Sequence, residues 1–336
     1  MSSFRSVASR FGMALILLLL VVYFSTMSEA FLTQQNLTNI LRQVAMLGIA
    51  AVGMTLVILT GGIDLSVGST LALTGVVAAL GMTYLDIGII PSIVLGLLTG
   101  VAVGLVNGLA VTALRIPPLI ATLAMLTAAR GVCFILTGGL PIFGFPSGFA
   151  VIGRGMVGIV PVPVIIMVVM MAIGWILLNH TKYGRYLYAI GGNQEAARLS
   201  GVPVGRYLII SYVIAGFFSA VAGIILLSRL NTGQPNTATG FEMDVITAVV
   251  LGGISIAGGE GRFTGVIFGV LLIGVLSNGM TLLNVQEYYQ LVIKGAVLFF
   301  AVALDQYNLR MNEVSRGRVV HETESKAAVL KPMPGE

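Results

Sequence analysis

Long apolar runs, separated by short polar segments, recur along the chain from Phe11 to Leu304. A helix that crosses a bilayer needs about 20 mostly apolar residues. Ten runs come near that length, and each predicts a membrane-spanning helix. They lie near residues 11–28, 43–61, 67–83, 88–112, 117–137, 160–179, 207–228, 243–258, 263–282 and 288–304.

This pattern predicts an all-α polytopic membrane protein with about ten transmembrane helices, some of them interrupted. The polar segments between the runs are too short to form a separate domain. We therefore expect a single transmembrane domain over residues 1–304, with a cytoplasmic loop at 180–206. Residues 305–336 are expected to form a flexible cytoplasmic tail.

The distribution of basic residues predicts the orientation, because lysine and arginine concentrate in cytoplasmic segments. With ten spans and the N-terminus inside, only Arg42, Arg154 and Arg229 lie in outside segments or span ends. Both termini are then cytoplasmic. The inside segments hold Arg5, Arg10, Arg115, Lys182, Arg185, Arg198, Arg206, Arg262, Arg310, Arg316, Arg318, Lys326 and Lys331.

The first thirty residues have two interpretations. Arg5 and Arg10, the apolar run 14–22 and the small residues around Glu29 together resemble a cleavable signal peptide. However, the apolar run continues to Phe24 and many further spans follow. An uncleaved first helix fits this pattern better.

Composition excludes several classes of protein. Only 9% of the residues are charged, against roughly 25% in soluble domains, so the chain cannot cover a water-facing surface. The net charge of +5 is spread over separate loops and the tail, without a basic stripe interleaved with aromatics. We therefore expect no nucleic-acid partner. Cys133 is the single cysteine, which excludes an intramolecular disulfide or a cysteine cluster for metal, and it is expected to be a small packed residue.

Motifs for enzymatic chemistry are absent from the sequence. The two histidines, His180 and His321, show no metal-ligand spacing, and no lysine lies in a phosphate-binding loop. We expect no catalytic residue, no metal and no bound cofactor on this chain. If ATP drives the protein, another subunit must hydrolyse it.

Glycine is abundant, with 43 residues, and much of it lies inside the apolar runs. Gly96, Gly100, Gly104 and Gly108 recur every four residues on one face of the fourth run. Small residues allow close helix contact in lipid, so this face predicts tight helix packing.

Two faint echoes also suggest an internal repeat. The segment 57–63 resembles 249–254, and 105–108 resembles 276–279. Paired glycine-rich breaks are typical of transporters built from repeats, although chance similarity between glycine-rich apolar segments is an equal alternative.

The segment 61–69 is the most informative in the membrane, because glycine and serine surround the carboxylate of Asp64. Glycine weakens a helix and a buried charge is costly, so a break is expected here. Asp64 is either a functional group or a cap of the helix that begins near Val67, or it reaches the interface at a span end.

Arg130 and Lys294 also lie within predicted spans. A charge at a helix centre costs roughly 2.5–3.5 kcal/mol on the insertion scale. For Lys294, near the start of its span, snorkelling to the interface is preferred over pairing with a carboxylate. Arg130 is more central in its span, and the sequence does not identify a partner for it.

The loop between the sixth and seventh runs predicts a short exposed helix. Asn193 suits the N-cap, Glu195 suits the first turn, and Gly201 suits a left-handed end. A helix of about two turns is not stable alone in water. It is therefore expected to bind a cytoplasmic protein or to rest on the lipid surface.

The sequence resembles the permeases of ribose-, xylose- and arabinose-type ABC importers, with matching pieces in order from Gly48 to Asp305. These pieces are GMTLVILTGGIDLSVGS (53–69), IPPLIATL (116–123), YGR (183–185), AIGGN (189–193), AARLSGV (196–202) and AVVLGG (248–253).

The resemblance implies a permease subunit in the bacterial inner membrane that imports a monosaccharide or related polyol. It implies a cytoplasmic ABC ATPase that uses ATP and Mg²⁺, a periplasmic sugar-binding protein and a second permease protomer. It also implies that one segment is a coupling helix seated on the ATPase. The segment comprises Gly192, Asn193, Glu195, Ala196, Ala197, Arg198, Ser200 and Gly201.

Polar residues beside glycine or proline within the apolar runs are candidates for the substrate path: Asp64, Ser66, Asn107, Thr122 and Asn278. Helix packing or capping is the competing role for each of them. A proton-coupled sugar transporter with Asp64 as the titrating group is the alternative function. A membrane receptor or scaffold without transport is a third.

Overall fold

The computed structural model describes residues 2–307, and side chains from residue 12 onward. The elements are α1 (Ser2–Met27), α2 (Gln34–Leu59), α3 (Val67–Thr83), α4 (Ile89–Thr112), α5 (Pro118–Thr137), η1 (Ser147–Phe149), α6 (Ala150–Arg154), β1 (Met156–Val157), β2 (Val160–Pro161), α7 (Val162–His180), α8 (Lys182–Gly192), α9 (Gln194–Leu199), α10 (Val204–Leu230), α11 (Phe241–Leu251) and α12 (Phe263–Leu282). A last helix spans Glu287–Tyr307. The tail from 308 onward, with its five basic residues, lies outside the described residues.

The outside of the bundle is as apolar as its inside. In the most apolar stretch of α2, 83% of the residues are buried. The corresponding shares are only 28% in α4 and 22% in α7, although the mean hydropathy of these two helices is higher. Large apolar side chains such as Ile90 and Ile135 are exposed. A surface this apolar is stable only in contact with lipid, which agrees with the predicted all-α membrane protein.

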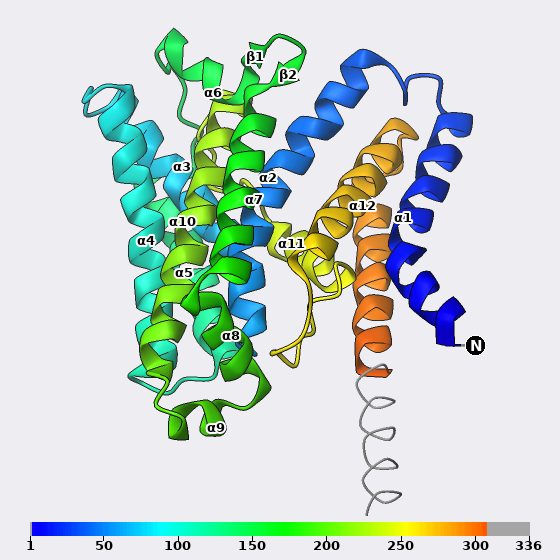
Figure 1. Cartoon of the computed structure of the whole chain (residues 1–336). Helices are drawn as coiled ribbons and strands as arrows, with labels where there is room; N and C mark the ends of the chain where they lie inside the picture. The colour runs from blue at the N-terminus through cyan, green and yellow to red at the C-terminus, as the bar shows by residue number, and fades with distance from the viewer. Residues whose placement is uncertain (1, 308–336) are drawn as a thin grey trace, which may run out of the picture.

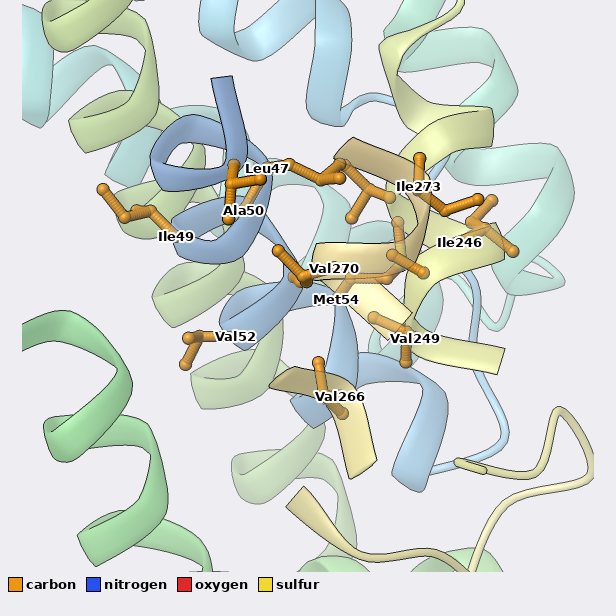
Figure 2. Close-up of a cluster of buried hydrophobic side chains, with 14 of the residues drawn as sticks. Leu47, Ile49, Ala50, Val52, Met54, Ile246, Val249, Val266, Val270 and Ile273 are labelled. Carbon is orange, nitrogen blue, oxygen red and sulfur yellow. The ribbon is translucent and has the colours of Figure 1, made fainter. Parts of the chain in front are cut away.

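Helix α2 lies in the middle of the bundle and is buried along most of its length. Figure 2 shows side chains of α2, among them Leu47 and Met54, beside Ile246 of α11 and Val270 of α12. On its other sides α2 packs against α10 and α7. These contacts place α2 between α11 and α12 on one side and α7 and α10 on the other.

The glycine face of α4 packs closely on α10, as its spacing predicts. A Cβ atom at Gly100 would meet backbone and side-chain atoms of Gly216 and Ala220, and one at Gly108 would meet Ile209. Gly216 in turn faces the backbone of Gly100. The prediction of tight helix packing is confirmed.

The two ends of the bundle differ (Figure 1). One end carries η1, α6 and the hairpin of β1 and β2, in which Met156 pairs with Pro161 and Val157 with Val160. The other end carries α8 and α9, and the N-terminal end of α1 lies toward it. In the structure, as in the predicted topology, Arg42, Arg154 and Arg229 share one end: Arg42 donates to the Arg154 carbonyl and Arg154 to the Arg229 carbonyl.

Seven helices within residues 12–307 are long and apolar enough to cross a membrane: α2, α4, α5, α7, α10, α12 and the last helix. The apolar helices Gly12–Met27 and Val67–Thr83 are shorter. The expected span at 243–258 differs most, because α11 has 11 residues, about 17 Å at 1.5 Å per residue. Gly252, Gly253 and Gly258 then continue the chain as irregular backbone with positive φ at the latter two, which ends the helix early.

Candidate functional site

The break predicted around Asp64 is present. Helix α2 ends at Leu59, Gly61 adopts a φ of +80°, and α3 begins at Val67. Asp64 Oδ1 accepts hydrogen bonds from the backbone N–H of Ser66 (2.8 Å) and from its hydroxyl (2.6 Å). Asp64 therefore closes the turn that precedes α3 and does not cap the helix itself. It is 2% exposed, so its carboxylate is surrounded by protein and does not reach the interface.

Two further path candidates join this turn. Asn107 of α4 donates its side-chain amide to Ser66 Oγ (2.9 Å). The Thr122 hydroxyl of α5 donates to the carbonyl of Ile63 (3.1 Å) and also bonds within its own helix. The structure thus brings Asp64, Ser66, Asn107 and Thr122 into one buried cluster, called here the Asp64 cluster, which ties the irregular segment to α4 and α5.

A cavity of about 570 Å³ lies on the α9 side of this cluster. It is lined by residues of the 60–62 turn, the turn between α4 and α5, α9 and α10. Tyr212 of α10 forms part of its wall. The Tyr212 hydroxyl is buried and has no hydrogen-bond partner in residues 12–307. Tyr212 was not among the residues predicted from the sequence. The signal that could have identified it is the pair of adjacent polar residues, Ser211 and Tyr212, within an apolar run.

Asn278 lies elsewhere. It is on α12, where it exchanges side-chain hydrogen bonds with Asn36 near the start of α2. That position is at the opposite end of α2 from the Asp64 cluster. The geometry gives Asn278 a helix-joining contact rather than a place beside the other four candidates.

The loop between α7 and α10 contains two helices, where the sequence predicted one. The Thr181 hydroxyl accepts from the N–H of Gly184 at the start of α8. Asn193 caps α9 by accepting from the N–H of Ala196 (2.9 Å), and Gly201 follows with a φ of +83°. The predicted N-cap and left-handed end are both confirmed.

The outer face of α9 is charged and open. Glu195 and Arg198 form an ion pair (2.6 Å), with side chains 61% and 68% exposed. This hydrogen bond raises the pKa of the Arg198 guanidinium. Ala197, on the opposite face, packs with Ile190 of α8 and Val204 of α10. Helix α9 is therefore held on the bundle by one face and presents charges at the other.

Lys294 does not follow the snorkelling interpretation. Its Nζ donates to Asp244 Oδ2 of α11 (2.7 Å), and the two side chains are 22% and 20% exposed. Two cavities, of about 420 and 370 Å³, both have Asp244 in their walls. Pairing with a carboxylate is thus the observed role. The sequence signal was Asp244, which lies at the margin of the eighth apolar run.

Arg130 also has its partners. Its Nη1 donates to the carbonyls of Pro235 and Thr237, each at 2.7 Å. These carbonyls belong to the segment between α10 and α11, so Arg130 fastens that segment to α5. Cys133, one turn further along α5, is fully buried in a hydrophobic cluster, as expected of a small packed residue. Among residues 12–307, no group of three or more metal-ligating side chains is close enough to hold a metal ion.

Comparisons with known proteins show which family this chain is similar to. A family described as "Branched-chain amino acid transport system / permease component" matches residues 36–302. The ribose import permease protein of Bacillus subtilis is 49% identical over 305 residues, which cover 90% of this chain and 94% of that protein. The Escherichia coli K12 ribose import permease protein is 46% identical, over 86% of this chain and 91% of that protein. The L-arabinose ABC transporter permease protein of Azospirillum brasilense is 39% identical, over 89% and 88%.

No solved structure matches the chain. The matched region includes α2, the Asp64 cluster, α8 and α9, and extends into the last helix. The chain belongs to this family of transport-system permease components.

Proposed function

We propose that the chain, as a member of that family, is the membrane-spanning permease subunit of a bacterial ABC importer for a sugar. The observation that carries this conclusion is 49% sequence identity to a ribose import permease over 90% of the chain. Ribose is the favoured substrate, because identity to the L-arabinose permease is lower at 39%. The protein is then a multi-pass protein of the bacterial inner membrane, embedded in lipid by its apolar outer helices.

The partners follow from the same proposal. Because the sequence has no phosphate-binding loop of its own, ATP must be hydrolysed by another subunit. We assign this role to a cytoplasmic ABC ATPase, which uses ATP and Mg²⁺. The charged outer face of α9 supports a docking role on that ATPase. A second permease protomer completes the path, and a periplasmic sugar-binding protein delivers the substrate.

The orientation is also a proposal. The end that carries α8 and α9 faces the cytoplasm, and the end with Arg42, Arg154 and Arg229 faces the periplasm, which places both termini inside. Residues 1–304 then form one permease domain and residues 305–336 a cytoplasmic tail. Single-cysteine labelling tests this arrangement, because buried Cys133 is the only native thiol. A cysteine at Glu195 should react only with reagent added from the cytoplasmic side.

The mechanism is alternating access. ATP binding favours one conformation of the ATPase pair, and the shift in population reaches the membrane helices through α9. The Asp64 cluster joins an irregular segment to α4 and α5 by side-chain hydrogen bonds, which break and re-form more easily than a helical backbone. We assign to this cluster the cytoplasmic closure of the path, with Asp64, Ser66, Asn107 and Thr122 along it.

Reconstitution tests the function. The permease is placed in proteoliposomes with its cognate ATPase and binding protein, and uptake of radiolabelled ribose and other pentoses is measured with ATP and Mg²⁺ on the ATPase side. ATP-dependent uptake is the expected result. Uptake that follows a proton gradient and ignores ATP would establish the proton-coupled alternative, and absence of uptake under either drive would favour a receptor or scaffold.

A further inference from the structure

Three segments far apart in the sequence meet at the α9 end of the bundle: the C-terminal end of α8, the end of α2, and the 252–262 loop that joins α11 to α12. The N–H of Gly259 donates to the carbonyl of Leu59 (2.9 Å). The Tyr188 hydroxyl of α8 donates to the carbonyl of Gly261 (3.1 Å). The 252–262 loop is therefore bonded to both α2 and α8.

Backbone lies directly against backbone at this meeting point, which we call the glycine junction (Gly61, Gly191, Gly258 and Gly259). A Cβ atom at Gly191 would meet the Leu59 carbonyl and the Gly259 N–H. One at Gly258 would lie 2.7 Å from the nitrogen of Gly61. A side chain can rotate away from such a contact, but a main chain cannot, so a displacement of one segment must move the others.

The loop is held on its far side as well. Asp305, at the end of the last helix, accepts from the Ser255 hydroxyl (3.0 Å) and from the N–H of Ile256 (3.2 Å). The 252–262 loop thus connects α8 and α2 with the last helix. Along the chain, Leu59 lies only a few residues before Asp64, so the junction borders the Asp64 cluster.

We propose that the glycine junction carries the motion of α9 to both interrupted segments at once, the one that follows α2 and the one that follows α11. Helix α9 continues α8 through Asn193, and α8 ends at the junction. Movement of α8 and α9 then shifts Leu59, and with it the Asp64 cluster, together with the 252–262 loop. This inference rests on the proposed function, because it requires a partner that moves α9.

The alternative is that these glycines only permit close packing, without a part in coupling. The two roles differ in what a substitution changes. A packing role lowers stability or assembly, whereas a transmission role lowers the sugar imported per ATP hydrolysed while the ATPase still binds and turns over.

Gly191→Ala places a methyl group against the Leu59 carbonyl and so tests the junction. Gly131→Ala is the matched control: Gly131 is also a helical glycine, it lies within α5 away from the junction, and its added Cβ meets no atom within 4 Å. Tyr188→Phe is a milder second variant, which keeps the ring and removes only the hydrogen bond to Gly261. Each is assembled with the ATPase and binding protein in proteoliposomes, and ribose uptake, ATP hydrolysis and retained ATPase are measured.

We expect ribose imported per ATP to fall about tenfold or more in Gly191→Ala and several-fold in Tyr188→Phe, within the range of coupling between sites in proteins. Gly131→Ala should match the wild type. A folded Gly191→Ala with wild-type import per ATP overturns the inference, as does loss of uptake caused by loss of the ATPase. If Gly191→Ala does not fold, an unchanged ratio in Tyr188→Phe overturns it. A wild-type complex without ATP-driven uptake instead refutes the proposed function.

Discussion

Asn36 and Asn278 exchange two side-chain hydrogen bonds, of 3.0 and 2.9 Å, between the start of α2 and the C-terminal part of α12. They are 242 positions apart in the sequence, and both are buried. Asn36 also donates to the carbonyl of Phe31. Each amide thus satisfies the other in an apolar setting, where an unpaired amide is costly.

We expect Asn278→Leu to lower the free energy of unfolding by about 1–3 kcal/mol, because it leaves the amide of Asn36 without one partner. The double variant with Asn36→Leu should lose less than the sum of the single variants. Thermal unfolding of the four proteins in detergent checks this. Additive losses would show that the pair is not coupled. Normal stability of Asn278→Leu with lost uptake would instead return Asn278 to the substrate path.

The ion pair of Lys294 and Asp244 predicts that removing one partner lowers stability more than removing both charges. Lys294→Met leaves the Asp244 carboxylate without its cation, and removal of one partner of a fully buried pair costs about 3–5 kcal/mol. The cost here should be smaller, because both side chains are about one fifth exposed. Adding Asp244→Asn to Lys294→Met should recover most of the loss. A Lys294→Met protein that unfolds at the wild-type temperature would favour snorkelling over pairing.

Asp64 separates the two transport mechanisms. Asparagine at this position still offers Oδ1 to the two donors of Ser66, so Asp64→Asn should fold and retain ATP-driven uptake. Asp64→Ala removes the oxygen that accepts both hydrogen bonds, at about 1.5–3 kcal/mol for each hydrogen bond to a charged group, and should lose folded yield. A proton-coupled transporter predicts the opposite for Asp64→Asn, namely a normal fold without uptake. Uptake and size-exclusion profiles of the two variants decide the matter.

Glu195 tests the docking face of α9. Glu195→Lys reverses the charge beside Arg198 on an exposed surface, so the fold should be unchanged while ATP-driven uptake is lost. Glu195→Gln, which keeps the size and one hydrogen-bond-accepting oxygen but removes the charge, is the control and should retain uptake. Intact ATP-driven uptake by Glu195→Lys, with the ATPase still bound, would argue against docking through this face.

Local patterns in the sequence predicted much of the fold. Apolar runs gave the spanning helices because a bilayer selects length and hydropathy. The four-residue glycine spacing gave the packed face of α4, and Asn193 and Gly201 gave the ends of α9, since caps depend on neighbouring residues. The early end of α11 was missed, because the apolar run continued through its glycines and hydropathy does not register a change of backbone conformation.

The sequence alone determined that the chain is a helical membrane protein with a break at Asp64 and a capped, exposed helix after α8. The tertiary structure decided which polar groups share a site: it gathered Asp64, Ser66, Asn107 and Thr122, and paired Asn278 with Asn36 and Lys294 with Asp244. It also brought Gly191 and Gly259 into backbone contact. The physical reason is that these partners lie on different helices, and their distance is set by how the helices pack, which the neighbouring residues of each do not encode.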